Sequence, residues 1–274
     1  MAIASSRGTT RLSPPKTHEL SSRKTRIDFV IAGAQKSGTT ALHAFLSDHP
    51  QISMPERKEM HFFNRPAWAD FSLPVWRDRK RALYHRNFPN FPDGRWMYGE
   101  ATPHYMTWNV ALDRIQSYNP NIRIMVVLRH PVERAYSHWN MEVQRGLVAS
   151  QFDDAVEHEL TKAASNDGPL DKVHSFIQRG FYTAQVESIW QRFGKAQTLV
   201  LKHRSLLQNH TETMAQVHAF LGVDNRHVPA QTVHSRAYSD TMNDATRQRL
   251  LNLYAEDVKQ IETLLGWDCS DWRR

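Results

Sequence analysis

Residues 27–49 read IDFVIAGAQKSGTTALHAFLSDH. The apolar run at 29–32 has the length and composition of a buried strand, and it breaks at Gly33. Apolar residues at helical spacing follow over 42–46. The pattern predicts a strand, a loop and a helix. Such a loop points successive backbone N–H groups toward one spot at the N-terminus of the helix, where the helix dipole also favours negative charge. We therefore expect an anion-binding site here.

The position of the lysine decides which kind of anion loop this is. A Walker loop, GxxxxGK[ST], places lysine directly after its second glycine, where this chain has Thr39. The only lysine in the loop is Lys36, two residues before Gly38, and no Walker B aspartate is recognisable nearby. The spacing disfavours a nucleotide triphosphatase. A glycine-containing turn that binds nothing remains the alternative.

The distribution of charge along the chain limits which other classes of function are compatible with the sequence. The formal net charge is +7, of which +5 falls in residues 1–26. We expect this Ser-, Thr- and Pro-containing basic segment to be a flexible tail and residues 27–274 to form a single domain. The nearly neutral body weakens the hypothesis of a nucleic-acid binding protein.

The sequence offers no sign of a membrane or metal protein. No stretch of about 18 apolar residues occurs, and no Cys/His cluster has the spacing of a zinc site. The one cysteine, Cys269, excludes an internal disulfide framework and suits a reducing compartment. We therefore expect a cytoplasmic protein without a bound metal.

Further apolar runs alternate with helical patterns along the chain. We predict strands at 122–128 and 198–202, both buried, and a short strand before GEATPHY at 99–105. Helices are predicted at about 74–87, 107–118, 131–146, 151–162, 182–193, 211–221 and 243–265. This alternation predicts an α/β fold, with a P-loop-like, mostly parallel central sheet flanked by helices on both faces.

A second anion-binding pattern follows the strand at 122–128. Arg129 stands where that strand ends, and Ser137 lies eight residues on, in the second turn of the next helix. An arginine fork and a hydroxyl together suit a phosphate monoester. The alternative is that Arg129 caps a surface turn and Ser137 is an ordinary helical serine.

These segments together resemble one family. QKSGTT at 35–40 resembles the 5′-phosphosulfate loop of sulfotransferases that use 3′-phosphoadenosine 5′-phosphosulfate (PAPS), and the pair Arg129 and Ser137 resembles their 3′-phosphate motif. KEMHFF at 58–63 resembles a segment of the carbohydrate branch of that family, the heparan sulfate sulfotransferase-like branch. Residues 250–272 resemble the closing helix of bacterial members.

The resemblance implies roles for individual residues. Glu59 is the implied general base, and His61 lines the acceptor pocket; without the other motifs, Glu59 is simply a solvated charge and His61 a packed ring. The implied nucleotide-binding residues are Lys36, Ser37, Gly38, Thr39, Thr40, Arg129, Ser137, Tyr182 and Arg236. For Tyr182 a buried core position is an equal alternative, and HSRAY at 234–238 departs from the Lys-Gly-Arg form of the family.

The expected activity is transfer of a sulfuryl group from PAPS to a hydroxyl or amine of a glycan or glycosylated small molecule, with no metal, nucleic acid or membrane span involved. Lys36 and the N–H groups of residues 36–40 would stabilise the leaving 5′-phosphate, and Glu59 would take the acceptor's proton. Two alternatives remain at this stage. They are a P-loop kinase acting on a small molecule and a non-catalytic protein that binds nucleotide or nucleic acid.

Overall fold

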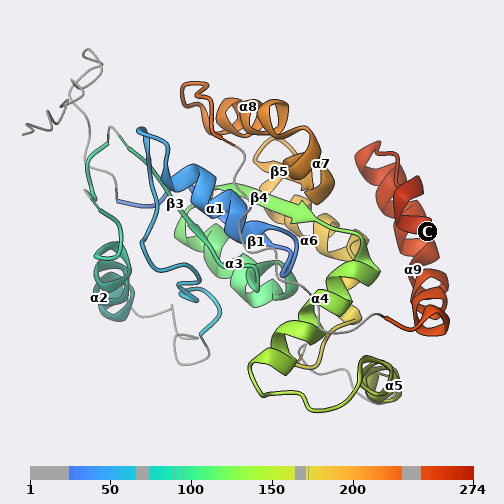
Figure 1. Ribbon diagram of the computed structural model, residues 1–274. Coiled ribbons are helices and arrows are strands. Elements are labelled where there is room, and N and C mark those ends of the chain that lie inside the picture. Colours follow the sequence, from blue (N-terminus) through green and yellow to red (C-terminus); the bar gives the residue numbers. More distant parts are fainter. Residues whose placement is uncertain are drawn as a thin grey trace, which may run out of the picture.

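The computed structural model describes residues 25–65, 74–89, 91–94, 96–163, 171, 173–229 and 242–274. Its sheet has five parallel strands in the order β2-β3-β1-β4-β5, with helices packed against both faces (Figure 1). The strands are β1 (Phe29–Gly33), β2 (Ile52–Ser53), β3 (Met97–Ala101), β4 (Arg123–Leu128) and β5 (Thr198–Lys202). The predicted α/β fold is confirmed.

Nine α-helices are assigned within the described residues. They are α1 (Thr39–Ser47), α2 (Pro74–His85), α3 (Asn109–Tyr118), α4 (Pro131–Gln144), α5 (Phe152–Ala163), α6 (Thr183–Phe193), α7 (His203–Gln208), α8 (His210–Leu221) and α9 (Asp244–Leu265). None of these helices is long and apolar enough to cross a membrane.

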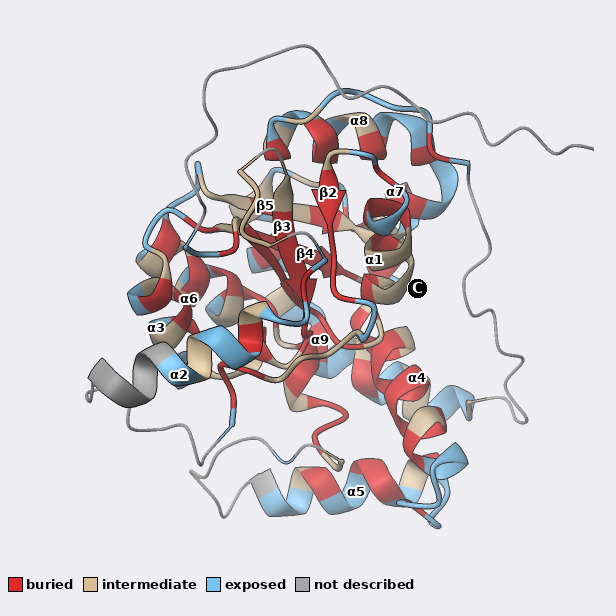
Figure 2. Ribbon diagram, turned by 90° about the vertical axis from the view of Figure 1, so that its left-hand side faces the viewer, coloured by how far each residue is buried: buried red, intermediate tan, exposed pale blue. Residues whose placement is uncertain are grey.

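Alternating side chains of the central strands feed two hydrophobic clusters, one on each face of the sheet. On β1, Val30 packs into the larger cluster with α3, α4, α6 and α9, whereas Phe29 and Ile31 pack into the smaller one with α1, α7 and α8. The buried stripes of these helices face the sheet (Figure 2). Both faces are therefore covered, as expected for parallel strands that are apolar throughout.

Three details differ from the sequence-based expectations. The strand β5 is at the edge of the sheet and only alternate residues are buried, so the prediction of a fully buried strand at 198–202 is wrong. The strand β3 runs into GEATPHY rather than ending before it, and it stops short of Pro103. The elements β2 and α7 were not predicted, because two and six residues give too short a pattern to detect.

Most of the tail predicted over residues 1–26 and all of the segment 234–238 lie outside the described residues. Within the aromatic-rich stretch at 64–95, Tyr84 and Phe88 are buried in the core.

Candidate active site

Four parallel strands end at the same edge of the sheet, and the predicted segments at 35–40 and at Arg129 follow two of these ends, whereas the segment at 58–63 follows β2 and is bonded to the end of β3. Gly33 ends β1, Ala101 ends β3, Leu128 ends β4 and Lys202 ends β5. The carboxyl edge of a parallel sheet is where α/β proteins bind ligands. We call residues 33–40 with Arg129 the β1–β4 side of the site, and residues 58–64 with 100–105 the β3 side.

On the β1–β4 side, the loop after β1 delivers its backbone to the start of α1. Lys36 and Gly38 have left-handed backbone, with φ of 67° and 93°. Gly38 is the N-cap of α1 and supplies no side-chain cap. The N–H groups of Gly38, Thr39 and Thr40 thus stand at a helix end that has no carbonyl of its own to offer them. This uncapped end, with the Lys36 side chain on the loop before it, can bind an anion.

One expectation about this loop is corrected. The Ser37 N–H donates to the carbonyl oxygen of Ala34 at 3.2 Å, so not all N–H groups of residues 36–40 are available to a ligand. The Ser37 side chain is wholly buried beside the Tyr182 hydroxyl.

Arg129 lies directly against the loop. Its Nη1 donates to the carbonyl oxygen of Lys36 at 3.3 Å, and its Nη2 is 3.9 Å from a carboxylate oxygen of Glu133. The helix behind it starts abruptly, because Pro131 occupies its first turn and the His130 ring accepts the Val132 N–H at 3.2 Å. The two anion-binding patterns predicted from sequence therefore meet at neighbouring strand ends.

Two of the remaining predicted nucleotide ligands, Ser137 and Tyr182, are buried. Ser137 is buried on α4, one turn beyond Glu133 on the same helix face. Tyr182 is fully buried, and its hydroxyl donates to the carbonyl oxygen of Arg129 at 2.8 Å. This contact fixes the backbone of Arg129. Arg236 lies outside the described residues.

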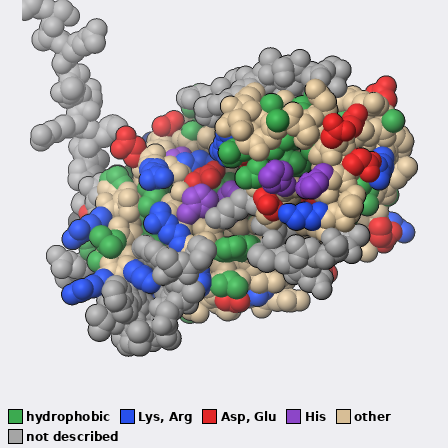
Figure 3. All heavy atoms as spheres, turned by 90° about the horizontal axis from the view of Figure 1, so that it is seen from below, with side chains coloured by type: hydrophobic (Ala, Val, Ile, Leu, Met, Phe, Trp, Pro, Cys, Tyr) green, Lys and Arg blue, Asp and Glu red, His purple; other side chains and the backbone are tan. Residues whose placement is uncertain are grey.

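On the β3 side, the loop at 58–63 brings a carboxylate next to the first turn of α1. The Lys58 ammonium donates to Thr40 Oγ1 at 2.9 Å and to Glu59 Oε1 at 3.2 Å, and His61 Nε2 is 3.4 Å from the other oxygen of Glu59. The Glu59 N–H donates to the carbonyl oxygen of Ala101, which ties the loop to the end of β3. The surface seen from below gathers histidine side chains among lysine, arginine and acidic ones (Figure 3).

The backbone of this loop is strained at Glu59 and His61. Glu59 and His61 have φ of 65° and 52°, in the left-handed region that costs residues with a Cβ about 1–2 kcal/mol each. Such conformations persist only where surrounding contacts hold them.

The charge of Glu59 is set by competing effects. Burial raises the pKa of its carboxyl, but the hydrogen bond to His61 and the charge of Lys58 outweigh burial and lower that pKa to about 2. Glu59 is therefore ionised at neutral pH, as a general base must be, although a carboxylate with so low a pKa is weakly basic. Burial lowers the pKa of Lys58, against the opposing charge of Glu59.

A buried arginine links the two sides, and the sequence did not single it out for a role. Arg179 is 2% exposed and donates to Gln35 Oε1 at 2.8 Å, His104 Nδ1 at 3.0 Å and the Asp171 carbonyl oxygen at 3.1 Å. The His104 ring lies 5.3 Å from that of His61. Burial lowers the pKa of Arg179 to about 10, so it remains charged at neutral pH.

Lys58, His104, Arg179 and Gln35 are thus the residues of the site that sequence reasoning missed. Lys58 lies inside a quoted motif, and its place beside Glu59 was the available signal. Gln35 and His104 also lie inside quoted segments, but their contacts with Arg179 were not detectable, because these contacts join segments 144 and 75 residues apart.

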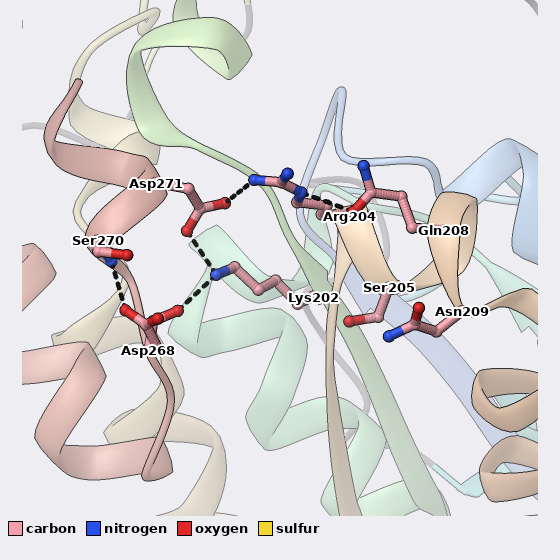
Figure 4. Close-up of a pocket in the computed structure, with 8 residues that line it drawn as sticks. All are labelled: Lys202, Arg204, Ser205, Gln208, Asn209, Asp268, Ser270 and Asp271. Carbon is pink, nitrogen blue, oxygen red and sulfur yellow. Dashed lines mark hydrogen bonds and ion pairs between the residues drawn. The ribbon is translucent and has the colours of Figure 1, made fainter.

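A further hollow of about 250 Å³ lies next to the end of β5, lined by Lys202, Arg204, Ser205, Gln208, Asn209, Asp268, Ser270 and Asp271. Its lysine and arginine both point to Asp271, at 2.7 and 3.4 Å (Figure 4). These cations are therefore less suited to a phosphate than the β1–β4 side. Among the described residues no group of three or more His, Cys, Asp or Glu side chains is arranged to hold a metal ion.

Comparison with known proteins gives related matches in sequence and structure. Human heparan sulfate glucosamine 3-O-sulfotransferase 3B1 is 29% identical over 194 residues, which cover 71% of this chain and 45% of the human protein. The bovine bifunctional heparan sulfate N-deacetylase/N-sulfotransferase 2 is 27% identical over 71% of this chain and 22% of its own length. The chain thus spans about half the length, or less, of these curated relatives.

The crystal structure of a sulfotransferase from Alicyclobacillus acidocaldarius superposes with a TM-score of 0.76 at 29% identity, covering 91% of this chain and 99% of the other. The profile of the sulfotransferase domain matches residues 26–263, which include both sides of the site. None of these matches supports the kinase alternative. The chain belongs to the sulfotransferase domain family.

Proposed function

We propose that this protein transfers the sulfuryl group of PAPS to a hydroxyl or amine of a carbohydrate-containing acceptor. The observation that carries the proposal is the contact between Arg129 Nη1 and the Lys36 carbonyl oxygen, 3.3 Å apart. It puts two anion-binding groups at adjoining strand ends, which suits a nucleotide with phosphates at both its 3′ and 5′ positions.

The residues of the β1–β4 side fit such a nucleotide. The uncapped start of α1 and the Lys36 ammonium would bind the 5′-phosphosulfate, and Arg129 with Ser137 would bind the 3′-phosphate. A Cβ on Gly38 would lie 2.8 Å from the His203 ring, so the loop has little space for a side chain where the phosphate would approach. Tyr182 would act through the backbone of Arg129. Residues 27–274 would form one domain around this sheet.

The chemistry follows from the charges that face each other. The acceptor oxygen or nitrogen forms a bond to sulfur while the bond from sulfur to the 5′-phosphate oxygen breaks, and the electron pair of that bond stays on the phosphate. The start of α1 and Lys36 stabilise the charge that grows there. The acceptor's proton passes to the carboxylate of Glu59, with His61 beside it.

Lys58 would connect the two halves of the reaction. Its ammonium bridges Thr40 and Glu59 in the free protein and so lies between the anion site and the base. When an anionic sulfuryl group enters, Lys58 would turn toward it. Glu59 would then lose the Lys58 share of the interactions that lower its pKa, while the hydrogen bond to His61 remains, and would become a stronger base for proton transfer.

A carbohydrate acceptor is supported by the relatives, whose names describe sulfation of heparan sulfate glucosamine. The buried positions of Tyr84 and Phe88 show that part of the aromatic stretch at 64–95 packs the core rather than an acceptor.

A nucleotide-binding experiment tests the proposal. We expect 3′-phosphoadenosine 5′-phosphate (PAP) to bind the wild type by calorimetry far more tightly than 5′-AMP or ATP. Arg129→Lys should weaken PAP about 10- to 100-fold and leave 5′-AMP nearly unchanged, because lysine cannot form the bidentate contact to the 3′-phosphate.

Arg123→Lys, at the opposite end of the same strand, is the matched control and should change neither affinity. Equal binding of ATP and PAP, or equal losses for both nucleotides in Arg129→Lys, would contradict the proposal. Labelled PAPS with a panel of hydroxyl- and amine-bearing glycans then tests turnover.

A further inference from the structure

A carboxylate is buried under the β3 side, outside the proposed chemistry. Glu100, on β3, has no exposed surface, and three hydroxyl groups donate to it. They are those of Thr102 at 2.7 Å, Tyr84 at 2.8 Å and Tyr105 at 2.9 Å. Burial raises the pKa of Glu100, and the three hydrogen bonds oppose this by favouring the ionised form. In that form the carboxylate only accepts hydrogen bonds, so it can take all three, and such charge-assisted bonds are stronger than neutral ones.

Two of these hydroxyls also hold the loop that carries Glu59. The His61 N–H donates to Thr102 Oγ1 at 3.4 Å, and the Phe63 N–H donates to the Tyr105 hydroxyl oxygen at 3.3 Å. A hydroxyl has one proton to donate. Because that proton goes to Glu100, the oxygen lone pairs are left to accept from the loop.

The loop needs this support because of its backbone. Glu59 and His61 are both in the left-handed region, which is unfavourable for residues with a Cβ. The Glu59 N–H is held by the Ala101 carbonyl oxygen, and the next two anchors along the loop are the hydroxyls that Glu100 orients. The three anchors alternate along the loop, at 59, 61 and 63.

We propose that Glu100 is a positioning residue for the β3 side: by orienting the hydroxyls of Thr102 and Tyr105, it keeps residues 59–63 in the conformation that presents Glu59 to the acceptor. The presentation of Glu59 to the acceptor rests on the proposed role of Glu59 as the base. The placement of residues 59–63 by Glu100 is independent of that role.

Two tyrosines provide a matched test. Tyr84→Phe and Tyr105→Phe each remove one buried hydroxyl that donates to the same oxygen of Glu100, and each keeps the ring. The Tyr84 ring stacks on Phe62, and phenylalanine keeps that contact, whereas of the two hydroxyls only that of Tyr105 accepts a hydrogen bond from the loop. We expect Tyr105→Phe to raise hydrogen exchange of the Phe63 amide about five- to tenfold, the loss of one hydrogen bond, while Tyr84→Phe leaves it nearly unchanged.

Glu100→Gln should also raise hydrogen exchange of the His61 or the Phe63 amide. The NH₂ group of the glutamine faces at least one of the hydroxyls, which must then accept from it and loses its place as an acceptor for the loop. Thr102→Val should also loosen the His61 amide, and Thr102→Ser should restore it. In the transfer assay, Tyr105→Phe should lower kcat about tenfold at unchanged PAP affinity, and Tyr84→Phe should not.

Wild-type exchange of both the His61 and the Phe63 amides in Glu100→Gln would overturn the inference, whatever the activity. Exchange is measured without acceptor or turnover, so a wild type that fails to transfer sulfuryl groups refutes the proposed function while the exchange result still decides the role of Glu100. If Glu100→Gln does not fold, Glu100→Asp, which keeps the carboxylate but withdraws it from the hydroxyls, takes its place, with PAP affinity and Tm as the checks on folding.

Discussion

The two sides of the site use different chemical groups. The β1–β4 side is made of backbone groups at one helix end, from the contiguous residues 33–40, with one arginine added from the next strand. The β3 side is made of side chains whose hydrogen bonds join residues 41, 42 and 75 positions apart. Backbone conformation should therefore govern nucleotide binding, and side-chain chemistry should govern the transfer step.

The largest expected effect is on the β3 side. Glu59→Gln keeps the size of the side chain but removes the carboxylate that we propose takes the proton, so kcat should fall about 10²- to 10⁴-fold. Glu56→Gln, an exposed residue three positions earlier, is the matched control. PAP affinity by calorimetry should change less than about threefold in both variants, since the base does not hold the nucleotide. Near-normal turnover in Glu59→Gln would refute the assignment of the base.

A smaller effect, with the opposite signature, is expected on the β1–β4 side. Gly38→Ala forces a Cβ onto a residue with φ of 93° and to within 2.8 Å of the His203 ring, so the loop must shift. PAP affinity should fall about tenfold, comparable to the loss of one to two hydrogen bonds. Gly222→Ala is the matched control. It also puts a Cβ on a residue with left-handed backbone, with φ of 71°, but there the Cβ meets nothing within 4 Å.

Gly38→Ala should lose more thermal stability than Gly222→Ala, because only its Cβ meets a neighbouring side chain, and only Gly38→Ala should lose PAP affinity. Equal PAP affinity in the two variants would mean that the backbone at Gly38 does not form the anion site.

The link between the sides should give a still smaller effect. Arg179→Lys places one ammonium where a guanidinium reaches Gln35, His104 and the Asp171 carbonyl, so at least one of these acceptors loses its donor. We expect turnover to fall a few-fold, by about the worth of one hydrogen bond, with a smaller change in PAP affinity. Arg249→Lys, a half-exposed surface pair with Glu157, is the control. If PAP affinity falls more than turnover, Arg179 belongs to the β1–β4 side alone.

The same contrast explains what the sequence could predict. Strand, loop and helix at 27–49 were predictable because apolar periodicity and glycine placement are local properties. The meeting of Lys36 with Arg129 followed from parallel strands, whose carboxyl ends share one edge. Glu59 and His61 were predicted through a resemblance to a family. The structure places their side chains 3.4 Å apart, and their roles remain proposals. Glu100 and Arg179 were not predictable, because their partners come from elements that only the folded chain brings together.

The smallest expected effect is the dependence of stability on pH that Glu59 creates. Its pKa in the folded protein is lowered from an ordinary 4.5 to about 2, so the unfolded chain binds this proton more tightly than the folded one does. The ionised carboxylate therefore stabilises the fold above pH about 4.5, and this contribution is lost as the pH falls toward 2. Wild type should be more stable than Glu59→Gln in denaturant at neutral pH, by less than about 1 kcal/mol because water screens a side chain that is 35% exposed. The difference should narrow steadily below pH about 4.5, and a difference independent of pH would mean that Lys58 and His61 do not hold the charged form.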